Sequence, residues 1–321
     1  NLAPYEWESR YIFTADDFID FFADTSVTYG ITKENEVGVV RKVDGFINLD
    51  DLRSLFSKYV DYRPFIDNIE LPEVKELRIT ERMTLGQRTF FNSLLERLKN
   101  IPADKSIDNV LKILVEGRQA SISESLFSGI KPTRENSPKI SKAIDIMVKL
   151  YKETGGNQLV FLDQYGRSQL GSDDLHNFIR NELIKEGIPA NEIVICNGNI
   201  NNSMEKKLEI QDAFNDGEYR FLIGTTSSIG AGMDLQEQTI AMHNLDIPWT
   251  PTAVAQKEGR GNRPGNLYNG ILNLHYYIRG SYDAWSASIV AIKKKWQDQL
   301  LLGGTESVGG YTKNQDDDSW S

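Results

Sequence analysis

The second half of the chain switches repeatedly between two hydrophobic periods. Short apolar runs predict buried strands, and the segments between them carry apolar residues three and four positions apart, which predicts helices. The expected strands are residues 158–162, 192–196, 219–224, 239–245 and 270–278, and the expected helices are 140–151, 172–183, 204–214, 251–263 and 282–301. This alternation predicts a parallel, doubly wound α/β sheet with ligand-binding residues at the carboxyl ends of its strands.

The first 136 residues follow a different pattern. Residues 1–70 are expected to be mainly helical, with an amphipathic helix over 51–62 that ends before Pro64. Residues 71–136 are expected to hold a strand over 75–80 and then helices. Within them the Ser, Gly and Pro of 119–139 favour a linker. We therefore divide the chain into segments 1–70, 71–136 and 137–303, followed by a disordered tail over 304–321 that has no periodicity.

Composition limits the function classes. The chain has 321 residues, 40% hydrophobic and 26% charged, which is typical of a globular protein. No apolar run is long enough to span a bilayer, so we expect no membrane partner. One cysteine, Cys196, and three histidines far apart in sequence give no metal-ligand pattern, so we predict no metal site and an intracellular protein, cytoplasmic if the source is prokaryotic or viral. The chain does not begin with methionine, so we expect a fragment or a processed form.

Charge confines any contact with nucleic acid to one face. The formal net charge of −10 argues against a general polyanion-binding surface. Residues 251–280, however, carry four basic residues against one acidic residue. A local basic face is therefore compatible with the acidic whole.

The segment 251–263 brings polar side chains to one side of a helix. Thr250 can cap it, and at 100° per residue Gln256, Arg260 and Arg263 fall within about 60° of one another. Two glycines within it cost about 1 kcal/mol each relative to alanine, which indicates a close approach there. The loop after strand 219–224 is rich in small, hydroxylated and glycine residues, which lets backbone and hydroxyls approach a ligand.

These two stretches carry a family resemblance. Gln256-x-x-Gly259-Arg260-x-x-Arg263 resembles the sixth motif of superfamily 2 helicases and translocases, and Gly224-Thr225-Thr226 through Gly232-x-Asp234 resembles the fifth. The stretches 159–165, 197–199 with 203–214, and 71–72 with 83–87 resemble flanking blocks of the Swi/Snf-type members. The similarity covers roughly residues 70–300. It implies a RecA-like C-terminal helicase lobe over 137–303, and it makes 1–70 the end of, or a projection from, a first lobe.

The resemblance also implies roles for residues. Arg260 and Arg263 would face the γ-phosphate of ATP, with Arg263 as the arginine finger, a group worth about 10³ to 10⁵ in rate. Gln256, Gly232 and Asp234 would take part in ATP binding: Gln256 would orient the arginines, Gly232 would allow close approach, and Asp234 would accept hydrogen bonds from the ribose or from the motif arginines. In the fifth motif, the nucleic-acid backbone would be contacted by Thr225, Thr226 and Ser227.

Simpler readings of the same residues stay open. The arginine helix can be a solvated surface helix, Asp234 can cap the following turn, and the hydroxyl residues can satisfy their own backbone. Asp163 is unusual in the opening strand of such a lobe, which weakens a nucleic-acid role for Gln164 or Tyr165.

The sequence lacks the other half of such a site. It contains no Gly-x-x-x-x-Gly-Lys-Thr/Ser loop and no Asp-Glu-x-His or Asp-Glu-x-Asp after a strand. ATP and Mg²⁺ would therefore be held mainly by an N-terminal RecA-like lobe of the same parent polypeptide. We expect half of an ATP-dependent helicase or translocase, inactive alone, with double-stranded DNA as its track. The alternatives are a non-catalytic helicase-like binding module and an unrelated doubly wound α/β enzyme.

Overall fold

A computed structural model describes residues 4–32, 37–62, 70–102, 104, 106–166, 174–198, 203–229 and 232–302. The chain divides into two compact units. The smaller contains residues 1–68, 98–111 and 288–321, and the larger contains 69–97 and 112–287. The predicted tail over 304–321 lies outside the described residues.

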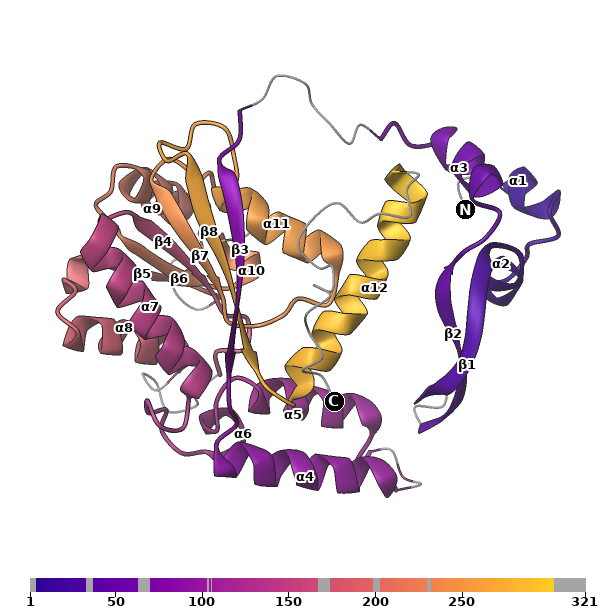
Figure 1. The fold of residues 1–321 in the computed structure, drawn as a ribbon, viewed down its shortest axis with the longest axis horizontal. Coiled ribbons are helices and arrows are strands. Elements are labelled where there is room, and N and C mark those ends of the chain that lie inside the picture. The colour runs from indigo at the N-terminus through magenta and orange to yellow at the C-terminus, as the bar shows by residue number, and fades with distance from the viewer. Residues whose placement is uncertain are drawn as a thin grey trace. The chain divides into compact units, whose positions relative to one another are not determined.

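The larger unit is built on a six-stranded sheet (Figure 1). Its strands, in spatial order, are β3 (Glu73–Glu81), β8 (Gly270–Ile278), β7 (Thr239–Asn244), β4 (Asn157–Phe161), β6 (Phe221–Gly224) and β5 (Ile193–Cys196). Every neighbouring pair is parallel. The predicted doubly wound parallel sheet is confirmed, and residues 73–81 supply its edge strand.

Helices cover both faces of this sheet. α7 (Pro138–Thr154) and α8 (Leu175–Lys185) pack on one face, and α9 (Met204–Asn215), α10 (Thr226–Ile229) and α11 (Pro251–Gly261) pack on the other. The chain also contains the helices α4 (Leu85–Lys99), α5 (Val110–Ala120), α6 (Ser125–Ser128) and α12 (Tyr282–Leu302) and a short 3₁₀ turn at Ala190–Glu192. Along β4 the side chains alternate: Val160 packs with α7 and α8, whereas Leu159 and Phe161 pack with α9. Because both faces are covered, the central strands β4, β6 and β7 are buried along their whole length.

The helix expected from residue 172 begins instead at Leu175. Asp174 caps it, since its Oδ1 accepts a hydrogen bond of 2.8 Å from the backbone N–H of Asn177. Ser172, the cap that the sequence favours, lies outside the described residues. Both residues can cap a helix, so the sequence alone does not choose between them.

Residues 119–139 are not a linker. They belong to the larger unit, and Ile122 is buried within its main core. The polar residues that suggested a loop are buried with it: the hydroxyls of Ser123 and Ser137 lie 2.7 Å apart. Small hydroxyl side chains that bond one another can be packed inside a domain, and composition does not distinguish this from a solvated linker.

The smaller unit contains a β-hairpin as well as helices. α1 (Pro4–Glu8) and α2 (Ala15–Phe22) precede the antiparallel strands β1 (Ala23–Ile31) and β2 (Val37–Phe46), and α3 (Leu49–Ser57) follows. The sequence does not indicate the hairpin, because apolar side chains occur on both of its faces: Val37 and Val39 are exposed and Val40 is half-buried, so apolar and polar residues do not alternate along β2. The helix expected over 51–62 is shorter, since its buried side chains, Leu52 and Leu55, lie within its first two turns.

A buried histidine links three strands of the large sheet. His243 of β7 lies 2.9 Å from Oε1 of Gln158 through Nε2 and 2.8 Å from the hydroxyl of Tyr276 through Nδ1. Complete burial lowers the pKa of His243 to about 3. Burial also lowers the pKa of His176, whose ring bonds the carbonyl of Leu162. Both rings are therefore neutral structural groups in the folded chain.

We expect acid to destabilise the larger unit before its carboxylates protonate. The unfolded chain binds a proton on His243 below about pH 6.5, whereas the folded chain does not until about pH 3, so stability is full above pH 6.5 and falls as pH decreases. Between pH 6.5 and pH 5 the loss is about 2 kcal/mol for this residue. Urea unfolding followed by tryptophan fluorescence at several pH values tests this. His243→Gln should reduce the dependence, and a stability that does not change over this range would contradict it.

Candidate functional site

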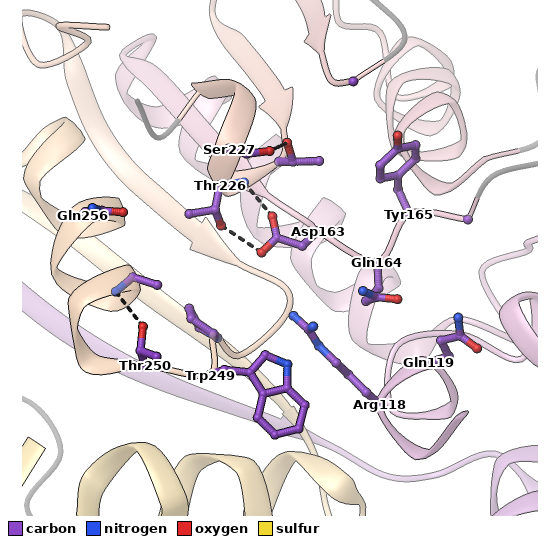
Figure 2. A pocket seen from close by; sticks show the side chains of 15 residues that line it. Arg118, Gln119, Asp163, Gln164, Tyr165, Thr226, Ser227, Trp249, Thr250 and Gln256 are labelled. Atoms are coloured by element: carbon purple, nitrogen blue, oxygen red, sulfur yellow. Dashed lines mark hydrogen bonds between the residues drawn. The ribbon is translucent and has the colours of Figure 1, made fainter. Parts of the chain in front are cut away.

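An open groove of about 830 Å³ lies in the larger unit beyond the carboxyl ends of β4, β6 and β7 (Figure 2). We call it the polar groove. It is lined by Arg118, Gln119, Asp163, Gln164, Tyr165, Gly166, Gly198, Thr225, Thr226, Ser227, Pro248, Trp249, Thr250, Ala253 and Gln256. Its position is that expected for ligands of a parallel α/β sheet.

The predicted site residues fall into two separate groups. Thr225, Thr226, Ser227 and Gln256 line the polar groove, whereas Gly232, Asp234, Arg260 and Arg263 do not. Gln256 and Arg260 are one turn apart on α11, but only Gln256 lines the groove. The helix α11 is the element that carries both groups.

The direction of α11 explains the separation. Its first residue follows Thr250, which caps it from the groove side with a bond of 3.2 Å to the N–H of Ala253. Its last residue, Gly261, packs where an added Cβ would lie 3.0 Å from Thr239 at the start of β7. α11 therefore runs back along the sheet. Gly261 makes the close approach that the sequence suggested, whereas no atom lies within 4 Å of the Cβ position at Gly259.

The arginine end of α11 is tied to the loop that follows α10. Nη1 of Arg260 donates a hydrogen bond of 2.9 Å to the carbonyl of Met233, and burial lowers the pKa of this guanidinium. Arg263 lies beyond the end of α11, which corrects its expected place on the helix. It forms an ion pair with Asp234. The two side chains are 34% and 60% exposed, so this pair is accessible to solvent.

In this loop Asp234 forms the ion pair and Gly232 allows a backbone conformation with positive φ. Of the partners left open for Asp234, the structure places a motif arginine at its carboxylate. Gly232 adopts a φ of +75°, and no atom lies within 4 Å of the position that a Cβ would take. In the chain alone, glycine is therefore required here by backbone conformation rather than by space.

The hydroxyl residues of the polar groove divide between internal and outward contacts. The hydroxyl of Thr225 lies 2.7 Å from that of Ser228, which donates to the carbonyl of Cys196 at 2.6 Å. Thr225 is thus engaged within its own loop. Thr226 is half-buried and bonded to Asp163, whereas Ser227 is exposed, with its hydroxyl 3.0 Å from that of Thr225.

A buried ion cluster supports the floor of the polar groove. The carboxylate of Asp246 accepts hydrogen bonds from the backbone N–H of Asp163 at 2.7 Å and of Gln164 at 3.2 Å. Lys257 of α11 lies 3.2 Å from its Oδ1, and Arg118 of α5 lies 3.3 Å from its Oδ2. Burial acts to raise the pKa of Asp246, but the two cations outweigh it and lower that pKa.

One histidine and two glutamates, from β8, β3 and α11, lie close together outside the polar groove. Within the described part of the chain, Glu76, Glu258 and His275 bring possible metal-ligand atoms within 4.8 Å of one another, a grouping that the sequence analysis did not expect. His275 Nε2 lies 2.8 Å from Glu76, and the buried amide of Asn273 donates to Glu76 at 2.8 Å and to Glu258 at 3.4 Å. These contacts account for the grouping as a set of side-chain hydrogen bonds with a bridging amide.

The family model for the helicase conserved C-terminal domain matches residues 139–265. This segment is a helicase C-terminal domain. The match includes the polar groove's β4 and β6 loops, the Asp234 loop and all of α11. The expected family is thereby confirmed for this part of the chain.

Solved structures show the same fold. The C-terminal part of the Fun30 ATPase domain aligns with a TM-score of 0.54 at 13% identity, over 68% of this chain and 90% of that one. The Sulfolobus solfataricus SWI2/SNF2 ATPase core domain aligns with a TM-score of 0.50 at 20% identity, over 79% of this chain and 48% of that one. The architecture is therefore the RecA-like one found in Swi/Snf-type C-terminal lobes.

One curated relative matches in sequence. The Defense against restriction protein B of Escherichia phage P1 is 23% identical in an alignment 209 residues long that covers 53% of this chain. The chain spans only 9% of the length of that protein. No helix in the described part of the chain is both long enough and apolar enough to cross a membrane.

Sequence reasoning missed several residues of the helicase domain's groove. Trp249 is 39% exposed at the rim and packs edge-on against Tyr282 and Trp285. Arg118 and Asp246 meet across 128 positions of sequence, so spacing could not pair them. A signal existed for Asp246 alone, because it is an acid directly after the apolar strand 239–245.

We expect Asp246→Asn to destabilise the helicase domain by about 3 kcal/mol or more, because it leaves Lys257 buried without a counter-charge. Urea unfolding measures the loss. Adding Lys257→Met should recover part of it. Asp145→Asn, which removes an exposed charge on α7, serves as the control and should change stability by less than about 0.5 kcal/mol. A small effect of Asp246→Asn would show that the cluster is not a stabilising unit.

Proposed function

We propose that this chain supplies the C-terminal motor lobe of an ATP-dependent DNA helicase or translocase of the Swi/Snf type. The observation that carries the proposal is the Arg263–Asp234 pair. In this pair the guanidinium of Arg263 is partly exposed just beyond the last residue of α11. The polar groove lies at the other end of the same helix, and the helicase C-terminal domain model matches both the helix and Arg263. Nucleotide and nucleic acid would thus act on opposite ends of one short helix.

Arg263 would act as the arginine finger. A planar guanidinium that stays charged suits the oxygens of a transferring phosphoryl group. In the chain alone, Asp234 holds this guanidinium, and a γ-phosphate would replace that carboxylate as its partner. The exchange costs little, because both side chains are accessible and exposed ion pairs contribute about 0–1 kcal/mol.

The rest of the ATP site would come from another lobe. ATP binding here would rest on Arg263, Arg260, Asp234 and the loop at Gly232, with Gln256 one turn before Arg260 on α11. The sequence has no Gly-x-x-x-x-Gly-Lys-Thr/Ser loop to bind phosphate and no Asp-Glu-x-His or Asp-Glu-x-Asp after a strand to bind Mg²⁺. These residues fit the γ-phosphate side of a nucleotide, and the N-terminal RecA-like lobe of the parent polypeptide would hold the remainder with Mg²⁺.

The polar groove would hold part of the nucleic-acid track. Ser227, Gln164 and Gln256 offer hydroxyl and amide groups of the kind that contact sugar and phosphate without reading sequence. The proposed track is double-stranded DNA. α11 is one continuous helix about 16 Å long. A shift of its arginine end on nucleotide binding would therefore also move Gln256 at the groove.

A non-catalytic binding module of the same fold is the second candidate. It would use the polar groove and lack the nucleotide function. The match to the helicase C-terminal domain removes the third alternative, an unrelated α/β enzyme.

In the complete polypeptide that joins this chain to its N-terminal lobe, we expect Arg263→Ala to reduce nucleic-acid-stimulated ATP hydrolysis about 10³-fold or more, because transition-state charge is no longer neutralised. Phosphate release at saturating DNA is the measurement. Arg180→Ala removes an exposed arginine of α8 and should leave the rate unchanged. A loss below tenfold would remove the finger assignment, and a wild type without any stimulated hydrolysis would favour the binding module.

The 321-residue chain by itself should not hydrolyse ATP above background, since it carries no phosphate-binding loop. The same phosphate-release assay tests this with Mg²⁺ and DNA present. Turnover that is abolished by Arg263→Ala would contradict the prediction, because it would mean that the isolated chain has a complete nucleotide site.

A further inference from the structure

Asp163 is directed at Thr226 with both carboxylate oxygens (Figure 2). Oδ1 accepts the backbone N–H of Thr226 at 2.6 Å, and Oδ2 accepts its hydroxyl at 2.9 Å. Both residues line the polar groove. A phosphate would use the same two donors with two of its oxygens, so the carboxylate takes the place that a backbone phosphate would otherwise occupy.

The backbone of Asp163 is held in place by the buried ion cluster. The backbone N–H of Asp163 is bound to Asp246 at 2.7 Å, and Asp246 is fixed by Lys257 and Arg118. The main chain at Asp163 therefore cannot withdraw without breaking the buried cluster. Only rotation of the Asp163 side chain would release Thr226.

The charges of the groove lining strengthen this effect. Of the lining residues, only Arg118 and Asp163 are charged, and Arg118 is bound to Asp246 and to the carbonyl of Ile247 at 3.4 Å. The side chain of Arg118 is 13% exposed, so little positive charge reaches solvent. A phosphate that approaches Thr226 therefore meets a carboxylate, and like charges at such distances repel.

We propose that Asp163 is an internal competitor for nucleic-acid phosphate and sets the affinity of the groove. Its carboxylate occupies the N–H and hydroxyl of Thr226, so a bound strand is held by Ser227, Gln164 and Gln256 and more weakly than the groove would otherwise allow. The inference rests on the proposed nucleic-acid function of this groove. A weakened contact suits a lobe that must release and rebind its track.

The test is the substitution Asp163→Asn in the full 321-residue chain. Asparagine keeps an oxygen that can accept from Thr226 but has no charge. Fluorescence anisotropy with a labelled 20-base-pair DNA duplex, and with the single strand of the same sequence, gives the Kd. We expect Asp163→Asn to bind about tenfold more tightly at low salt, with the gain shrinking as salt screens the repulsion. Asp145→Asn removes an equal charge outside the groove and should change the Kd less than about twofold.

A strand with a methylphosphonate backbone distinguishes competition for phosphate from a general effect. It carries no backbone charge, so Asp163→Asn should give no gain with it. Asp163→Ser is a second neutral variant whose hydroxyl can accept from Thr226, and it should reproduce the gain on ordinary DNA. Thermal unfolding of each variant verifies that it is folded.

Three results would overturn the inference. Asp163→Asn and Asp163→Ser, both folded, could bind DNA no better than the wild type, which would make the carboxylate a structural cap of the Thr226 loop. An equal gain on the neutral strand would exclude competition for phosphate. If neither the wild type nor the variants bind any of the strands, and the complete polypeptide does not bind them either, the proposed function itself fails.

Discussion

The buried carboxylate of Asp246 is the interaction on which the site depends. It follows β7 directly and receives the backbone of the β4 loop, the lysine of α11 and the arginine of α5. Each cation alone would be costly to bury, and each backbone N–H would need a partner. One fully buried acid satisfies all of them, and so it fixes the position of three elements around the polar groove.

The helix α11 extends the influence of that cluster to the other end of the lobe. Lys257 is held inward, and this sets the rotation of the whole helix. Gln256 consequently lines the groove, while Arg260 donates a hydrogen bond to the carbonyl of Met233 in the loop after α10. Gly261 then lets the helix end lie against Thr239, which puts Arg263 beside Asp234. The two proposed functional surfaces are thus separate in space but share one rigid element.

The groove combines donors with an unexpected acid. A basic, open phosphate track would bind nucleic acid strongly and in a salt-dependent manner. Here the one acid of the lining, the half-buried Asp163, is bound to the residue best placed to hold a phosphate, and the one arginine is bound to Asp246. The polar groove is consequently close to neutral, which accords with a chain whose net charge is −10.

The sequence by itself determined the parallel α/β sheet, the order of its strands and helices, and the two motifs, because hydrophobic periodicity and motif spacing are local properties. Through the family resemblance it also offered the motif arginines, as an alternative to the ribose, as partners of Asp234. The tertiary structure alone decided that Gln256 and Arg263 face different surfaces, that residues 119–139 are packed inside the larger unit, and that Asp163 binds Thr226. These outcomes depend on tertiary contacts, such as that between Asp163 and Thr226, which are 63 positions apart, and on which faces are buried. Neither of these can be read from local spacing.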